Sequence, residues 1–213
     1  MNKKELAVIL SRIKIFKYAS IKLEQYPTES EIAADVLWKA NMDGDVEGKT
    51  IVDLGAGHGV LGIGSLLMGA KKVSFIDIDK EALKIAKENL KEVSKNVNKK
   101  FHSSFLNKNV KDVRVKADVV IQNPPFGVKN THADKMFLLK AMSIAPVVYS
   151  FHKMATQNFV EKVAVDHGFK ANLVAKYRFP LKRTMWYHMK KVYYVDVGVW
   201  RIVKNLSSKS NKK

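Results

Sequence analysis

The chain has 213 residues, of which 46% are hydrophobic, and this suits one globular domain with a single substantial core. The absence of cysteine excludes disulfides, zinc ribbons and thiol nucleophiles. The six histidines show no metal-ligand spacing with carboxylates, so we expect no metal site. The sequence has neither a long apolar run nor the apolar core of a signal peptide, and we expect a soluble, cytoplasmic protein.

The charge is strongly basic and unevenly distributed. The net charge is +18, and residues 176–213 contain eleven Lys or Arg against one Asp, so more than half of the excess lies in these last 38 residues. Such a surface favours a polyanionic partner, because phosphate contacts release counterions. We therefore expect a nucleic acid partner; the alternative is a solvated basic surface.

The N-terminal part of the chain is predicted to be helical. Apolar residues recur at helical spacing over 3–17 and predict an amphipathic helix. Thr28, followed three residues later by Glu31, forms a capping box that predicts the start of a second helix.

From residue 50 onward, short apolar strands alternate with helices. Strands are predicted over 50–54, 72–77, 117–122, 147–152 and 192–203, and helices over 59–68, 80–95 and around 137–142. This alternation predicts an α/β fold with a mostly parallel, doubly wound sheet that binds ligands at the carboxyl ends of its strands. We expect one domain over residues 1–204, with an N-terminal helical extension, followed by a disordered basic tail over 205–213.

A glycine-rich loop follows the first predicted strand. Glycines in the string 53–59, Asp-Leu-Gly-Ala-Gly-His-Gly, let the backbone approach a ligand closely. Asp77 ends the next strand, 20 residues after Gly57, where a carboxylate can accept hydrogen bonds from two ribose hydroxyls. The pair indicates an adenosine-containing cofactor. Dinucleotide binders use Gly-x-Gly-x-x-Gly, whereas here the third glycine comes one residue early, which disfavours a dehydrogenase. The string resembles motif I of class I methyltransferases and implies S-adenosylmethionine.

The tetrapeptide Asn123-Pro124-Pro125-Phe126 follows the strand 117–122 and so lies at the same edge of the sheet. The Asn123 side-chain oxygen and the Pro124 carbonyl can accept hydrogen bonds from the two N–H groups of an exocyclic amine and hold its nitrogen in line with a methyl donor. The prolines stiffen this turn, and Phe126 offers a face for a flipped planar base. No general base is needed before attack. The motif resembles the Asn/Asp-Pro-Pro-Tyr/Phe signature of amino-group methyltransferases, whose acceptors include adenine N6, guanine N2, cytosine N4 and protein glutamine.

Three further strings narrow the resemblance. Residues 24–28, Glu-Gln-Tyr-Pro-Thr, residues 123–130, and residues 149–153, Tyr-Ser-Phe-His-Lys, are together similar to the methyltransferase-like protein 5 family of archaea and eukaryotes. That family methylates adenine N6 in small-subunit ribosomal RNA. The resemblance covers residues 23–202 and implies a Rossmann-like class I methyltransferase, with a mostly parallel seven-stranded sheet, an antiparallel C-terminal strand and helices on both faces. Eukaryotic relatives depend on a small zinc-binding activator protein, which the resemblance adds as a candidate partner.

The resemblance also implies a set of cofactor-binding residues. The family carries an Asp after its third strand, which receives the adenine amino group of the cofactor. We place that position at Ser103-Ser104, where a serine is a weaker acceptor than a carboxylate. The expected cofactor-binding residues are Gln25, Tyr26, Thr28, Asp53, Gly55, Gly57, Asp77, Ile78, Ser104 and Asn123.

Basic and aromatic side chains are interleaved over 180–191, a predicted loop. This mixture suits single-stranded or splayed RNA, although the aromatic residues could instead cover the core. Residues at the end of the strand 147–152, and one after the tetrapeptide, could contact RNA phosphates. The expected RNA-binding residues are Lys129, His152, Lys153, Lys182, Arg183, Trp186, Tyr187, His188, Lys190 and Lys191.

The sequence thus favours methylation of adenine N6 in small-subunit ribosomal RNA, with S-adenosylmethionine as donor. Methylation of guanine N2 in RNA, or of protein glutamine, would use the same tetrapeptide and stays open. A non-catalytic RNA-binding assembly factor that retains the fold also stays open, but the intact glycine loop, Asp77 and Asn123 argue against it.

Overall fold

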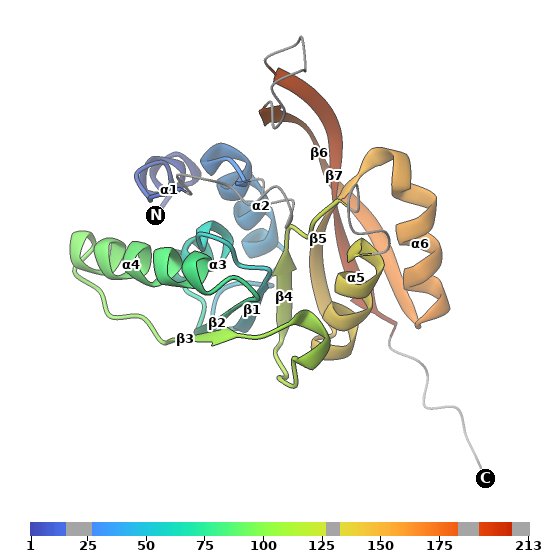
Figure 1. Cartoon of the computed structure of the whole chain (residues 1–213), viewed down its shortest axis with the longest axis horizontal. Coiled ribbons are helices and arrows are strands. Elements are labelled where there is room, and N and C mark those ends of the chain that lie inside the picture. Colours follow the sequence, from blue (N-terminus) through green and yellow to red (C-terminus); the bar gives the residue numbers. More distant parts are fainter. Residues whose placement is uncertain (16–26, 127–132, 183–191, 206–213) are drawn as a thin grey trace.

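A computed structural model describes residues 1–15, 27–126, 133–182 and 192–205. Its helices are α1 Lys3–Leu10, α2 Ser30–Met42, α3 Val60–Leu67, α4 Lys80–Asn96, α5 Ala133–Ile144 and α6 Gln157–Asp166, with the short 3-10 helices η2 Val110–Asp112 and η3 Met154–Thr156. Its strands are β1 Thr50–Leu54, β2 Lys72–Asp77, β3 Ser103–Asn107, β4 Val119–Gln122, β5 Val147–Lys153, β6 Phe169–Lys182 and β7 Val192–Lys204. Figure 1 labels these elements.

Within the described residues, the strands form one seven-stranded sheet in the order β3-β2-β1-β4-β5-β7-β6. Strands β1 to β5 are parallel, and β7 runs antiparallel between β5 and β6. This arrangement confirms the prediction of a mostly parallel sheet with an antiparallel C-terminal strand. The chain moves outward from β1 to β3 and then returns to β4, so the strand order reverses between β1 and β4. Ligands of open α/β sheets bind at such a switch point, beyond the carboxyl ends of the strands.

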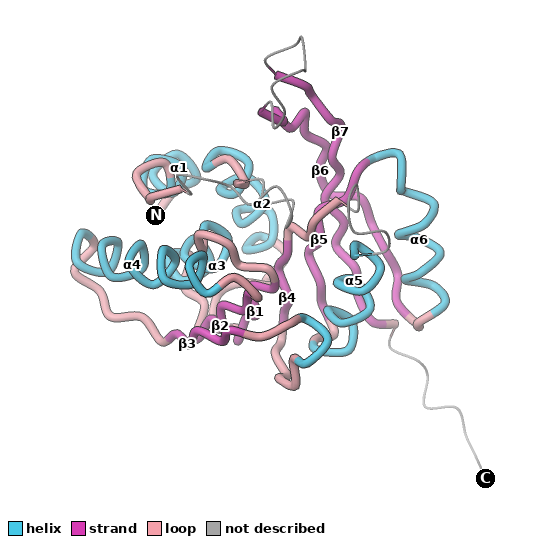
Figure 2. The backbone as a smooth tube through the Cα atoms, viewed as in Figure 1, coloured by secondary structure: helices cyan, strands magenta, loops and turns pink. Residues whose placement is uncertain are grey.

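Helices cover both faces of the sheet. Apolar side chains of α1, α2, α3 and α4 form one core with the first face, and those of α5, α6 and η2 form a second core with the other. Figure 2 shows the two helical layers on either side of the strands. Buried strand residues alternate between the two cores: Val52 and Leu54 of β1 lie in the second, and Ile51 lies in the first. No helix in the described ranges is long and apolar enough to cross a membrane.

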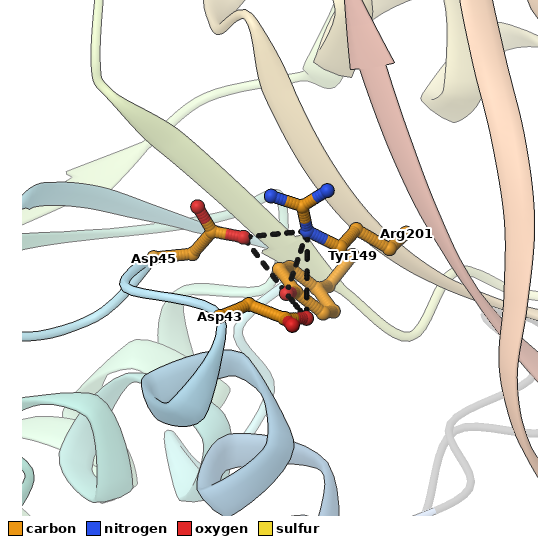
Figure 3. A network of polar contacts seen from close by, with 4 residues as sticks. All are labelled: Asp43, Asp45, Tyr149 and Arg201. Carbon is orange, nitrogen blue, oxygen red and sulfur yellow. Dashed lines mark hydrogen bonds and ion pairs between the residues drawn. The ribbon is translucent and has the colours of Figure 1, made fainter.

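The C-terminal end of α2 is attached to the sheet by a polar network of four residues (Figure 3). The buried Tyr149 hydroxyl of β5 lies 2.9 Å from an Asp43 carboxylate oxygen and 2.8 Å from an Asp45 carboxylate oxygen, and its single proton can be donated to either one. Arg201 of β7 donates through Nε to Asp45 at 2.7 Å. These contacts raise the pKa of Tyr149 above its ordinary value, through burial and the two neighbouring carboxylates. The network fixes the segment after α2 against the central strands.

Several predicted boundaries were wrong. The first helix ends at Leu10 rather than at residue 17, and strand β6 continues through Pro180 to Lys182, where we expected a loop. Strands β3 and β6 and helix α6 were not predicted as elements. Thr28 does not cap α2, whose N-cap is Glu29 without a side-chain hydrogen bond; the capping box forms at α1, between Asn2 and Glu5. Of the predicted basic tail, residues 206–213 lie outside the described residues.

Candidate active site

A cavity of about 950 Å³ opens at the carboxyl ends of β1, β2 and β4. It lies at the switch point between β1 and β4, as the fold predicts. Its lining comes from the glycine loop, the end of β2, η2, the tetrapeptide and one side of α5. The lining residues include Thr28, Asp53, Gly55, Gly57, Asp77, Ile78, Asn109, Asn123, Pro125 and Phe137.

The glycine loop turns tightly between β1 and α3. Gly55 has φ +75°, a left-handed conformation that glycine adopts without strain, and a Cβ there would lie 3.0 Å from the Phe137 ring. Gly57 also has a positive φ, 54°, and its backbone N–H donates to the Asp77 carboxylate at 2.8 Å. The loop is therefore held against the end of β2, which brings the two predicted cofactor-binding segments together.

Two carboxylates on the cavity wall differ in their hydrogen bonds. Asp53 Oδ2 accepts a hydrogen bond from the Gly62 N–H at 2.8 Å, whereas its Oδ1 is buried and has no partner. Burial raises the pKa of Asp53 to about 7. Asp77 accepts from the backbone N–H groups of Gly57 and Asp79, and burial raises its pKa as well. Each carboxylate oxygen of Asp77 keeps a lone pair that can accept a hydroxyl.

Asn123 of the tetrapeptide has one occupied and one open side-chain atom. Its Nδ2 donates to the Thr28 hydroxyl at 3.0 Å, whereas its Oδ1 is buried without a hydrogen-bond partner. Among the described residues, five buried side-chain polar atoms lack a partner, and two of them, on Asp53 and Asn123, belong to residues that line this cavity. A buried acceptor without a donor is unfavourable by about 1–3 kcal/mol, which a ligand N–H would offset. Both residues thus present an acceptor that a ligand can use.

The rest of the tetrapeptide forms the wall beside Asn123. Pro125 lines the cavity, whereas Pro124 is buried. Phe126 is only 9% exposed and packs into the first core. The ammonium group of Lys153, at the end of β5, lies over the Phe126 ring, 5.9 Å from its centroid. Phe126 therefore presents little free ring surface in this conformation.

Comparisons with known proteins give the chain a family. The family model described as "Methyltransferase small domain" matches residues 29–144, which include the whole cavity wall except Thr28. The chain is 36% identical over 209 residues to the rRNA N(6)-adenosine-methyltransferase METTL5 of Danio rerio, covering 93% of this chain and 96% of that protein. The chain belongs to the methyltransferase-like protein 5 family. This confirms the resemblance drawn from the sequence.

Two archaeal proteins are also similar to this methyltransferase. An uncharacterised protein of Methanocaldococcus jannaschii is 37% identical over 210 residues, covering 96% of this chain and 95% of that protein. The crystal structure of a candidate RNA methyltransferase from Pyrococcus horikoshii superposes with a TM-score of 0.86 at 41% identity, covering 96% of this chain and 98% of that chain. The similarity therefore extends over nearly the whole fold.

The methyl donor of this methyltransferase is S-adenosylmethionine, and the cavity residues fit it. The open Asp53 oxygen suits a cationic group, and the absent Cβ at Gly55 leaves the loop backbone accessible from the cavity. Asp77 offers hydroxyl acceptors beside Ile78, which is 53% exposed at the cavity rim. The described residues of the expected cofactor set that line this cavity are Thr28, Asp53, Gly55, Gly57, Asp77, Ile78 and Asn123.

The predicted adenine contact at Ser104 is wrong. Ser104 lies early in β3, where its hydroxyl donates to Ser74 at 2.9 Å, and it is not part of the cavity lining. The alignment failed because residues 103–107 are the third strand itself, not the loop after it. The residues that follow β3 and line the cavity are Lys108, Asn109, Val110 and Lys111. Phe105 and Leu106, followed by the turn-forming string Asn-Lys-Asn, were the available signal.

The predicted phosphate contact of His152 is also wrong. His152 is 2% exposed, and its Nε2 lies 2.7 Å from the Ser150 hydroxyl, which also accepts from Gln122 Nε2 at 2.9 Å. Burial lowers the pKa of His152 to about 3, so the ring is neutral at physiological pH. These buried hydrogen bonds link His152 through Ser150 to Gln122, the residue directly before Asn123, and so help to hold the start of the tetrapeptide in place.

The other predicted contacts fall into two groups. Lys153 lies beside the tetrapeptide, as expected for a residue at the end of β5. Lys182 is the last residue of β6. The remaining predicted residues lie outside the described residues: Gln25, Tyr26, Lys129, Arg183, Trp186, Tyr187, His188, Lys190 and Lys191.

Proposed function

We propose that this methyltransferase transfers a methyl group to N6 of an adenine in small-subunit ribosomal RNA. The observation that carries the proposal is the buried, unpartnered Oδ1 of Asn123 at the wall of the cavity. The name of the similar Danio rerio protein supports ribosomal RNA and adenine N6. The net charge of +18 supports an RNA substrate.

The chain's own groups act by holding the acceptor amine. Asn123 Oδ1 and the Pro124 carbonyl accept hydrogen bonds from the two N–H groups of the amine, which orients the nitrogen toward the donor. When bound, S-adenosylmethionine supplies an electrophilic methyl group. Asn123 cannot rotate its amide freely, because Thr28 holds the nitrogen end. The proton that the methylated amine loses leaves after transfer, so no side chain has to act as a base beforehand.

An adenine must leave its stack to reach Asn123, and Phe126 is the proposed stacking surface. Because Lys153 covers the Phe126 ring, stacking requires the lysine side chain to move away. Its ammonium group would then be available to a phosphate of the same RNA. Lys153 would thus exchange one favourable contact for another as the base enters.

Further partners belong to the same proposal. The predicted residues outside the described ranges, Lys129 and those of 183–191, are proposed as further RNA contacts. The small zinc-binding activator of eukaryotic relatives is a proposed partner. In the described sheet, edge strand β3 pairs only with β2, and its open side could accept an added strand. A cytoplasmic location is proposed with the substrate.

Nucleoside mass spectrometry tests this function. Small-subunit ribosomal RNA is incubated with the purified chain and S-adenosylmethionine, and then digested to nucleosides. We expect N6-methyladenosine with the wild type and none with Asn123→Ala. Methylguanosine would replace the proposed acceptor, and methylglutamine formed in a parallel incubation with ribosomal protein would replace the proposed substrate class. Cofactor binding without any product would favour the assembly factor.

A further inference from the structure

Strands β6 and β7 continue past the end of the rest of the sheet. The last residue of β5, Lys153, pairs with Val197, which pairs on its other side with Tyr177. Residues 192–196 and 178–182 therefore form a two-stranded arm beyond β5, of about 17 Å at the usual rise per residue. Figures 1 and 2 show this arm projecting from the layered body.

The arm projects at the edge of the sheet where the reaction takes place. Strands β4 and β5 are parallel, with Gln122 opposite Ser150, so β4 ends at the same edge as β5. The tetrapeptide begins directly after Gln122. A polynucleotide that places one base at Asn123 would therefore extend past the base of this arm.

The two faces of the arm differ. Phe179 is buried and Val195 is half-buried, and both pack into the first core. On the opposite face, Tyr194 is a large aromatic side chain that is 59% exposed. Arg178 is exposed beside it, with the guanidinium carbon 5.0 Å from the centroid of the Tyr194 ring.

We propose that Arg178 and Tyr194 form a stacking platform for an unpaired nucleotide of the RNA substrate. A planar guanidinium and an aromatic ring are the two side-chain surfaces on which bases stack, and the guanidinium can also pair with phosphate. Both residues lie outside the segment 180–191, from which the sequence predicted RNA contacts, although Tyr194 follows that segment closely. The inference rests on the proposed RNA substrate.

The basic charge around Arg178 and Tyr194 favours an anionic partner such as RNA. Lys176 is exposed on the same face of β6. Asp196 is directly opposite Arg178 in the strand register, yet among the described residues no ion pair joins them. The guanidinium is thus directed to the tyrosine ring, with its N–H groups left available for an anion.

Fluorescence anisotropy with the full chain tests the platform. The probes are a labelled single-stranded RNA oligonucleotide and an RNA duplex of equal length. Tyr194→Ala and Arg178→Ala should each weaken binding of the single strand about fivefold or more. Tyr194→Phe keeps the ring and should bind like the wild type. Lys71→Ala removes one exposed charge just before β2, at the opposite edge of the sheet, and should change affinity by less than about twofold.

The outcomes separate this inference from the proposed function. If Tyr194→Ala binds the single strand as well as Tyr194→Phe while the wild type still methylates RNA, the platform is refuted and the function stands. Equal weakening for single strand and duplex would show a charge effect without stacking, and would also refute it. A wild type that binds neither probe and methylates no RNA would overturn both. Unchanged thermal unfolding and cofactor affinity of the variants exclude misfolding.

Discussion

The side-chain amide of Asn123 donates to the Thr28 hydroxyl at 3.0 Å, and in this arrangement the amide oxygen has no hydrogen-bond partner. With the nitrogen bound, the oxygen is the free atom, and only an oxygen can accept from an amine N–H. We propose that Thr28 is a positioning residue. It lies just before α2, a helix that the network of Tyr149 and Arg201 holds at its other end.

Removing the Thr28 hydroxyl should reduce catalysis more than cofactor binding. In Thr28→Val the Asn123 amide can turn its nitrogen toward the amine, and we expect kcat to fall about tenfold, the loss for a hydrogen bond of about 1.4 kcal/mol. Thr28→Ser keeps the hydroxyl and should retain most of the activity. Single-turnover rates and cofactor titration measure the two effects. A loss found wholly in the cofactor Kd would assign Thr28 to cofactor binding instead.

Cofactor affinity should increase with pH through neutrality. Asp53 has a pKa raised from 3.8 to about 7 by burial, so the unliganded chain holds a proton there that a cationic ligand displaces. Calorimetry in two buffers of different ionisation enthalpy should detect proton release at about pH 7. Asp53→Asn should bind more weakly and without this linkage. If the variant keeps the same pH dependence, another group, such as Asp77 with its raised pKa, is responsible.

The same pKa shift affects the stability of the unliganded chain. Because the folded pKa of Asp53 lies above the unfolded one, its contribution to folding is fully present below about pH 4 and is lost as the pH rises through about 7. Thermal unfolding should show the wild type losing stability relative to Asp53→Asn over that range. Parallel curves would contradict the assignment.

The Tyr149 hydroxyl should stabilise the fold. It is buried and lies within hydrogen-bond distance of two carboxylates, so Tyr149→Phe removes the one donor that they share and should reduce the free energy of unfolding by about 1–3 kcal/mol. Tyr194→Phe is the matched control, because that tyrosine is 59% exposed and its change should stay within about 0.5 kcal/mol. Urea denaturation compares them. Equal effects at both positions would argue against the network.

His152 and Lys153 are neighbours with different expected effects on RNA binding. Lys153→Gln should reduce the salt dependence of RNA affinity by about one phosphate contact. His152→Gln should leave that slope unchanged, because the ring is buried and neutral, and should instead lower the melting temperature and kcat through Ser150 and Gln122. A reduced slope in His152→Gln would restore the phosphate contact that its burial excludes.

The sequence predicted the parts of the fold that local patterns specify. Strand β1, the glycine loop and Asp77 follow from apolar runs and glycine spacing, and the tetrapeptide follows from a strand that stops at two prolines. Strand β3 was missed because it has only two apolar residues, Phe105 and Leu106, among polar ones. Because β3 was not recognised, the predicted adenine contact was wrongly placed at Ser104.

Contacts between distant segments could not be predicted from the sequence. The Thr28 hydroxyl suits a helix cap locally, yet it accepts from Asn123, 95 residues away. His152 looks like an accessible strand-end residue in the sequence, but β7 pairs with β5 and brings the centroid of the Trp200 ring to 5.8 Å from that of the imidazole ring. In both residues, tertiary packing overrides the local preference.

The most direct test of the account is the single-turnover rate of N6-methyladenosine formation on small-subunit ribosomal RNA, compared between the wild type and Asn123→Ala at saturating S-adenosylmethionine. The account predicts that the variant binds cofactor and RNA close to normally, because its fold and the Asp53 and Asp77 contacts are unchanged, while its rate falls by at least about a hundredfold. A variant that forms N6-methyladenosine at a rate near that of the wild type would contradict the central role of the Asn123 oxygen.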